Sequence, residues 1–259
     1  TFVLPEKATE IPDFPEELIK EGLEEISSSP QGHLSRPLRY KILQAFRSPR
    51  IAGRVGILCA LKVLPIWRKY FGKKHEIIEL LRKAEYCLGE KATPDEITKI
   101  ADYISSLVEG HDYGTNFAPL MAGMAAVQAA YTVTDGNDCE EVAENDEELA
   151  SDEWDAAFLA SLSCNGGAAD LSEINPESNR EFWKWYLTDC IPYVYENEKY
   201  SGCHASNKIR IPTPTNCNVT LSDKINRLNS ALDSYIHAPT NRKEILRMQP
   251  YATDGELIR

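Results

Sequence analysis

Residues 116–134 place the tightest constraint on the fold, because small and apolar side chains occupy nearly every side of the helix that this segment can form. The small residues are Ala122, Gly123, Ala125, Ala126, Ala129 and Ala130. A helix that is apolar all round is buried in the protein interior. We therefore predict that this helix lies at the centre of a helical bundle.

The segments on both sides of it also have apolar residues at helical spacing. They predict helices over 15–26, 38–46, 50–71, 75–89, 93–110, 154–164, 177–195 and 220–237. Thr93-Pro94-Asp95-Glu96 has the pattern of a helix start, with a hydroxyl that can cap the first turn. Gly53 and Gly56 would let a neighbouring helix approach the third helix closely.

No convincing strand alternation occurs up to residue 134, and only Lys208 to Ile211 could form a short strand. The sequence thus predicts an all-α fold, a multi-helix bundle with a loop-rich, aromatic C-terminal part that includes a loop from Asn197 to Thr220. We expect residues 1–135 to form the core of the bundle. Residues 136–259 would add an acidic helix and a C-terminal helical extension, packed on the core as one unit.

The net charge of −12 conceals two blocks of opposite sign. Residues 26–75 contain 11 Lys and Arg and no acid, whereas residues 100–179 contain 17 Asp and Glu and no Lys or Arg. Either the two blocks face each other inside the fold, or one of them faces a partner of opposite charge.

The densest part of the acidic block is a candidate partner-binding site. It comprises Glu140, Glu141, Glu144, Asp146, Glu147, Glu148, Asp152, Glu153 and Asp155. Blocks of like charge are often solvated tails, but Leu149, Trp154 and Ala157 lie within or beside this run, as in a surface helix with a packed inner face. Such a surface would attract a basic partner over about 10 Å in physiological salt.

The sequence contains no motif that indicates catalysis, a cofactor or a metal. Neither of the common phosphate-binding glycine patterns occurs. Cys190, Cys203, His204, Cys217 and His237 are suitable zinc ligands, but they lack the short spacings of zinc sites. We therefore expect no cofactor and no metal.

Two alternatives remain open. A pocket lined by Tyr193, Tyr195, Cys203 and His204 would make the protein a Cys/His-dependent enzyme. A nucleic-acid-binding protein would use the basic residues 36–74. Separately, an aromatic cluster could be a stacking platform for bases; it comprises Trp183, Trp185, Tyr186, Tyr193 and Tyr195. The acidic net charge argues against a polyanion, and core packing is the simpler role for the aromatic cluster.

The chain has no apolar run of the roughly 18–20 residues that a membrane span needs. Its seven cysteines cannot all pair within the chain, and Cys59 and Cys87 lie in helical apolar patterns. These features favour a soluble protein in the reducing cytoplasm, without a membrane partner.

Three stretches carry a resemblance to a known family. RVGILCALKVLPIW at 54–67, LLRKAEYCLGE at 80–90 and APLMAGMAAVQAAYTV at 118–133 resemble the helical immunity proteins numbered five of bacterial polymorphic toxin systems, and their relatives. The resemblance spans about residues 34–134. The sequence departs from the family after Trp67, where Arg68, Lys69, Lys73 and Lys74 replace an acidic turn.

The resemblance implies a non-catalytic, all-α inhibitor that binds a cognate protein toxin. Because no catalytic residues belong to such a protein, none is assigned. The acidic residues identified above independently suit a basic toxin.

Overall fold

The computed structural model describes residues 12–72, 76–89, 93–135, 146, 149–150, 153–165 and 174–202. This part of the chain is helical and contains no strand, which confirms the predicted all-α class. The helices are α1 (Glu16–Ser28), α2 (Arg36–Ala45), α3 (Pro49–Phe71), α4 (Glu76–Leu88), α5 (Pro94–Glu109), α6 (Tyr113–Asp135), α7 (Ala156–Cys164), α8 (Pro176–Trp185) and α9 (Ile191–Gly202). A π-helix, Tyr186–Cys190, joins α8 to α9.

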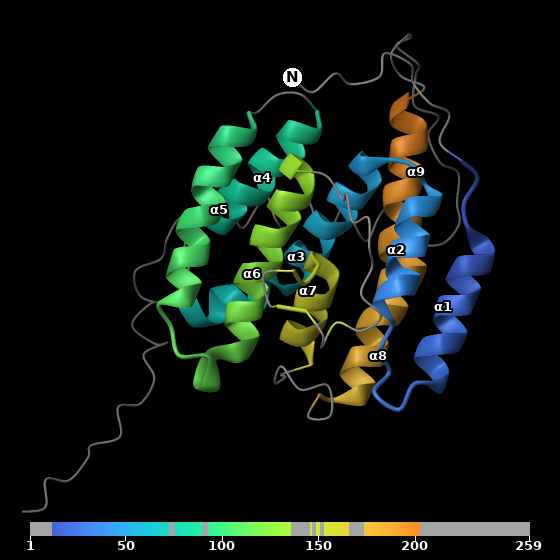
Figure 1. The fold of residues 1–259 in the computed structure, drawn as a ribbon, viewed down its shortest axis with the longest axis horizontal. Helices are drawn as coiled ribbons and strands as arrows, with labels where there is room; N and C mark the ends of the chain where they lie inside the picture. Colours follow the sequence, from blue (N-terminus) through green and yellow to red (C-terminus); the bar gives the residue numbers. More distant parts are fainter. Residues whose placement is uncertain are drawn as a thin grey trace, which may run out of the picture. The chain divides into compact units, whose positions relative to one another are not determined.

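The small-residue helix α6 is central, as predicted. It contacts α3, α4, α5 and α7, and the alanines of its second half are fully buried. In Figure 1, α4 and α5 lie on one side of it, and α2, α8, α9 and α1 lie on the other. The helix is interrupted near its start, where Asn116 has non-helical dihedral angles and Pro119 cannot donate a backbone hydrogen bond.

Glycines on α3 and α6 allow these two helices to pack closely against each other. A Cβ atom at Gly53 would lie 2.9 Å from a methyl group of Val133. One at Gly123 would lie 2.5 Å from the ring of Trp67, which is buried. The close approach expected from Gly53 and Gly56 is thus present in the packing of α3 on α6.

Two local expectations were wrong. The Thr93 side chain makes no capping hydrogen bond, although α5 does begin with Pro94. The loop expected from Asn197 does not begin there, because α9 continues to Gly202. The remainder of that loop, the short strand at 208–211 and the helix expected over 220–237 lie outside the described residues.

The aromatic segment forms part of the core. Trp183 and Tyr186 are fully buried and meet edge to face, with 5.4 Å between ring centroids. Trp185 is less buried, and the Lys62 ammonium group lies 4.1 Å from its ring centroid. Packing therefore accounts for these three rings.

The contacts place the described helices before and after residue 135 in one compact unit within residues 1–210. None of the described helices has the length and apolar character needed to cross a bilayer.

Candidate functional site

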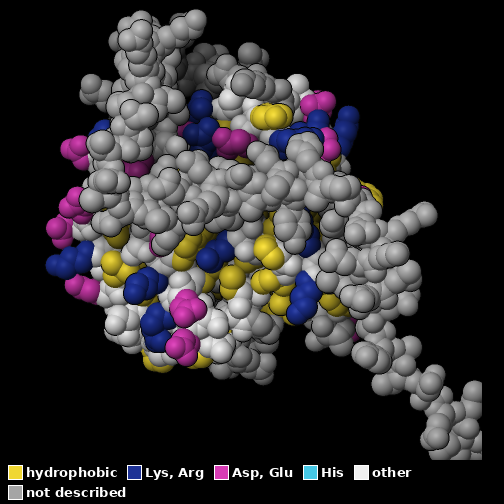
Figure 2. Space-filling model, turned by 180° about the vertical axis from the view of Figure 1, so that it is seen from behind, with side chains coloured by type: hydrophobic (Ala, Val, Ile, Leu, Met, Phe, Trp, Pro, Cys, Tyr) yellow, Lys and Arg dark blue, Asp and Glu magenta, His cyan; other side chains and the backbone are white. Residues whose placement is uncertain are grey.

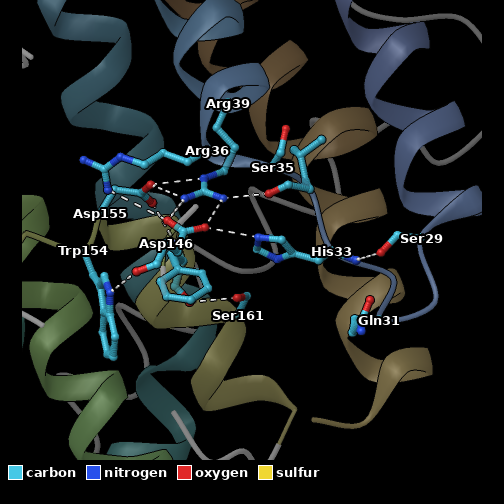
Figure 3. Close-up of polar contacts among 12 residues, drawn as sticks. Ser29, Gln31, His33, Ser35, Arg36, Arg39, Asp146, Trp154, Asp155 and Ser161 are labelled. Atoms are coloured by element: carbon cyan, nitrogen blue, oxygen red, sulfur yellow. Dashed lines mark hydrogen bonds and ion pairs between the residues drawn. The ribbon is translucent and has the colours of Figure 1, made fainter. Parts of the chain in front are cut away.

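The described residues of the acidic run meet the basic block at one buried guanidinium group. Arg39, on the first turn of α2, is 1% exposed and lies between the carboxylates of Asp146 and Asp155 (Figure 3). The two acids come from the segment between α6 and α7. The network therefore joins parts of the chain that are more than a hundred residues apart.

Arg39 uses every N–H group that an arginine has. Its Nη1 donates to the Leu34 carbonyl at 2.7 Å and to the Asp146 carboxylate at 3.0 Å. Its Nη2 donates to Asp146 at 2.5 Å and to Asp155 at 2.7 Å, and its Nε donates to Asp155 at 3.1 Å. These five hydrogen bonds, which end on four oxygen atoms, use all five N–H donors of the guanidinium group. The rings of Trp183 and Phe158 lie 5.1 and 5.5 Å from its central carbon, so the cation is also enclosed by aromatic faces.

Asp155 links this network to the next helix. It is the N-cap residue of α7, where its second oxygen accepts a hydrogen bond from the Phe158 amide at 2.8 Å. The same carboxylate thus starts α7 and binds α2.

Asp146 is held on several sides. The His33 ring lies 3.1 Å from its carboxylate, and Arg36 lies 3.8 Å away. The Asp146 carbonyl accepts a hydrogen bond from the Trp154 indole at 2.8 Å. Arg36 also donates to the Glu153 carbonyl at 3.1 Å. These contacts fix the described positions of the acidic run against α2.

The charges in the network shift its pKa values. Burial alone would raise the pKa of Asp146, but the Arg39 charge and hydrogen bonds from His33 and Arg39 outweigh it and hold that pKa well below its usual range. Burial would likewise lower the pKa of Arg39, but Asp155 and Asp146 raise it above its usual value. Asp146 and Arg39 therefore both stay charged near neutral pH.

Two of the nine acids predicted to form the partner-binding surface are bound to Arg39 instead. Asp146 is 2% exposed and bound to Arg39, so its carboxylate is not available on the surface. The Asp155 side chain is 21% exposed and faces Arg39 and the start of α7. Glu153 is exposed, as the acidic surface requires. The other six, Glu140, Glu141, Glu144, Glu147, Glu148 and Asp152, lie outside the described residues, and their role stays a prediction.

The basic block is partly neutralised by internal ion pairs. Besides Arg36 and Arg39, Arg54 pairs with Glu85 and Glu198, and Arg50 pairs with Glu198. On the face shown in Figure 2, Lys and Arg side chains are separated by hydrophobic and acidic ones. The interpretation that the two blocks face each other inside the fold holds for Arg36 and Arg39 with Asp146 and Asp155.

Sequence reasoning missed Arg39 and His33 as the partners of the acidic run. A signal for Arg39 was present, because it shares the buried stripe of α2 with Leu38, Ile42 and Phe46. A charged residue on an apolar stripe needs a buried partner of opposite charge. No comparable pattern marks His33, which lies before the helix.

The residues of the enzyme alternative are only partly described. Tyr195 is buried against Phe14 and Phe46, whereas Cys203 and His204 lie outside the described residues. Among the side chains that the structure places, no group of three or more His, Cys, Asp or Glu residues could hold a metal ion. Cys59, Cys87, Cys164 and Cys190 are free thiols.

Comparison with known families now adds a decisive observation. The model of the immunity protein family Imm5 matches residues 19–193. The chain belongs to the Imm5 family. The match covers all the described helices from α2 to α8, and it is longer at both ends than the resemblance at residues 34–134. A search of curated proteins finds no significant match.

The match also includes the buried network of this Imm5 protein. His33, Arg36, Arg39, Asp146 and Asp155 all lie within residues 19–193. The network therefore belongs to the part of the chain that the family model describes.

Proposed function

We propose that the protein is an immunity protein that binds a cognate protein toxin and blocks it, without catalysing a reaction. The observation that carries this proposal is the Imm5 match over residues 19–193. Inhibition by binding needs a complementary surface and no catalytic group. A role in the cytoplasm agrees with the free thiols of the four cysteines that the structure describes, because disulfides are rare in reducing compartments.

We further propose that the exposed part of the acidic run contacts the toxin, and that the toxin is basic at this contact. Glu153 is exposed beside the buried network, and no Lys or Arg occurs anywhere from residue 100 to residue 179. Arg39 and Arg36 hold this part of the chain at Asp146, Glu153 and Asp155. An anchored acidic segment would present its carboxylates at lower entropic cost than a free tail would.

The test measures binding of the cognate toxin, identified by co-purification from the source organism or from a neighbouring reading frame. Charge reversal by Glu147→Lys, Glu148→Lys and Asp152→Lys should lower the association rate at least about tenfold at low salt, because complementary charge acts mainly on association. Added salt should weaken the wild-type complex and reduce this difference.

A matched control reverses three exposed acids on α1, with Glu17→Lys, Glu21→Lys and Glu24→Lys. It makes the same change in net charge at another place, so it should affect association much less. Equal losses in both triple variants would reject the acidic run as the contact. A toxin complex that neither variant weakens would reject the acidic contact and leave the immunity function standing, whereas absence of any toxin complex would reject the function.

A further inference from the structure

A small cavity lies next to the Arg39 network, between α2, α3, α6, α7 and the π-helix. Its volume is about 30 Å³. The polar residues of its wall include Arg39, Asp155 and Tyr186, and much of the remaining wall is made by small apolar residues of α3 and α7. A water molecule needs about 10–15 Å³ of such space, so the cavity can take one or two waters and nothing much larger.

One wall residue has an unmet hydrogen-bonding group. Tyr186 is fully buried, and its hydroxyl has no hydrogen-bond partner among the described residues. Burial and then the neighbouring Cys59 and Asp155 groups raise the pKa of Tyr186 well above its usual value, while Arg39 acts in the opposite direction. Asp155 and Arg39 therefore both lie within electrostatic reach of the phenolic oxygen. Buried hydroxyls in proteins nearly always have a partner, either protein or ordered water.

The neighbouring charges exclude an ion as that partner. Arg36 and Arg39 carry two positive charges, and Asp146 and Asp155 carry two negative ones. All N–H groups of Arg39, the cation in the cavity wall, already have acceptors, so Arg39 has no donor left to bind an anion. The hydrogen bonds from Arg39 to Asp155 end on the other carboxylate oxygen, so the oxygen that binds the Phe158 amide can accept a further hydrogen bond. The site thus suits a small neutral molecule that both accepts and donates.

We propose that this cavity is an internal water site, in which one or two water molecules connect the Tyr186 hydroxyl to the Asp155 carboxylate. Tyr186 begins the π-helix, and Asp155 caps α7. The water would join these two elements to α2 through Asp155 and Arg39, and give the buried Tyr186 hydroxyl a hydrogen-bond partner.

The first test is a crystal structure of the wild-type protein at about 1.5 Å or better. We expect density for a water at about 2.5–3.0 Å from the Tyr186 hydroxyl oxygen. A cavity without density, a bound ion, or a Tyr186 hydroxyl bonded directly to another protein group would overturn the proposal.

The second test counts long-lived internal waters in solution by oxygen-17 magnetic relaxation dispersion. Ala157 lines the cavity, so Ala157→Val should fill it and lower the count by at least one. Ala160→Val makes the same change on the same helix away from the cavity wall and should leave the count unchanged. A count that Ala157→Val leaves unaltered in a folded protein would contradict the proposal. If that variant does not fold, the wild-type crystal structure decides.

Discussion

At the scale of single residues, Arg39 determines whether the acidic run is attached to the helical core. Its guanidinium group donates hydrogen bonds to two carboxylates and one carbonyl, and the residue is almost completely buried. Removing one partner of a buried ion pair leaves an uncompensated charge, which costs more than the pair contributes. The side chain is therefore a structural requirement for the position of Asp146 and Asp155.

We predict that Arg39→Met destabilises the protein by about 3–5 kcal/mol, because the buried Asp146 carboxylate loses its closest cation and the partly exposed Asp155 loses the same partner. Lys41→Met removes the same charge from an exposed position of the same helix and should change stability by less than about 0.5 kcal/mol. Urea unfolding followed by circular dichroism measures both. Similar losses in the two variants would mean that the buried pair has no special weight.

The pKa of Asp146 gives stability a defined pH dependence. Because this pKa is lower in the folded than in the unfolded state, its contribution is present above about pH 4, the pKa of an unfolded aspartate. It is lost as the pH falls through the folded pKa. The free energy of unfolding of the wild type should therefore fall between about pH 4 and pH 2, and Asp146→Asn should reduce that slope. Equal slopes in the two proteins, measured by urea titration at each pH, would contradict this cause.

At the scale of helices, the spacing of apolar residues in the sequence predicted where most of the helices lie. The apolar stripes of α1 to α5 and the small residues of α6 predicted helices close to those observed. The buried face of a helix can be recognised from the spacing of apolar residues within the segment itself. The predictions of a cap at Thr93 and of a loop beginning at Asn197 were wrong. A capping hydrogen bond depends on one side-chain rotamer, and the end of a helix depends on tertiary contacts. The partners of Asp146 were not predictable from spacing, since Arg39 is 107 residues away.

The contact of α3 with α6 depends on Gly123. An added Cβ atom would lie 2.5 Å from the Trp67 ring, which is 2% exposed and has little room to move. We predict that Gly123→Ala costs about 1–3 kcal/mol despite the better helix propensity of alanine. Gly110→Ala is the control, because that glycine has a helical φ of −74° and no atom nearer than 3.6 Å to the added carbon. It should be neutral or slightly stabilising, by less than about 1 kcal/mol. Thermal unfolding distinguishes the two, and a neutral Gly123→Ala would show that Trp67 can move.

At the scale of the whole molecule, part of the charge separation in the sequence is cancelled in the fold. Arg36 and Arg39 of the basic block neutralise Asp146 and Asp155 of the acidic block. Because these two arginines and two aspartates sum to zero, the whole net charge of −12 arises outside this network, where exposed acids such as those of α1 and Glu153 contribute to it. A partner-binding surface is therefore to be sought among the acids that have no internal partner.

The extent of the compact helical unit predicts which part of the chain is sufficient for folding and for toxin binding. Residues 1–210 form one compact unit, the described core lies before residue 203, and the family match ends at residue 193. We predict that a chain ending at Arg210 folds cooperatively, with a melting temperature within about 5 °C of the full chain, which corresponds to a change of roughly 1–2 kcal/mol for a domain of this size. It should also bind the toxin as the full chain does, because the proposed contact lies within it. Circular dichroism melting and toxin titration measure the two properties separately. Loss of cooperative melting would show that residues 211–259 are needed for the fold, whereas retained melting with lost binding would move the toxin contact to those residues.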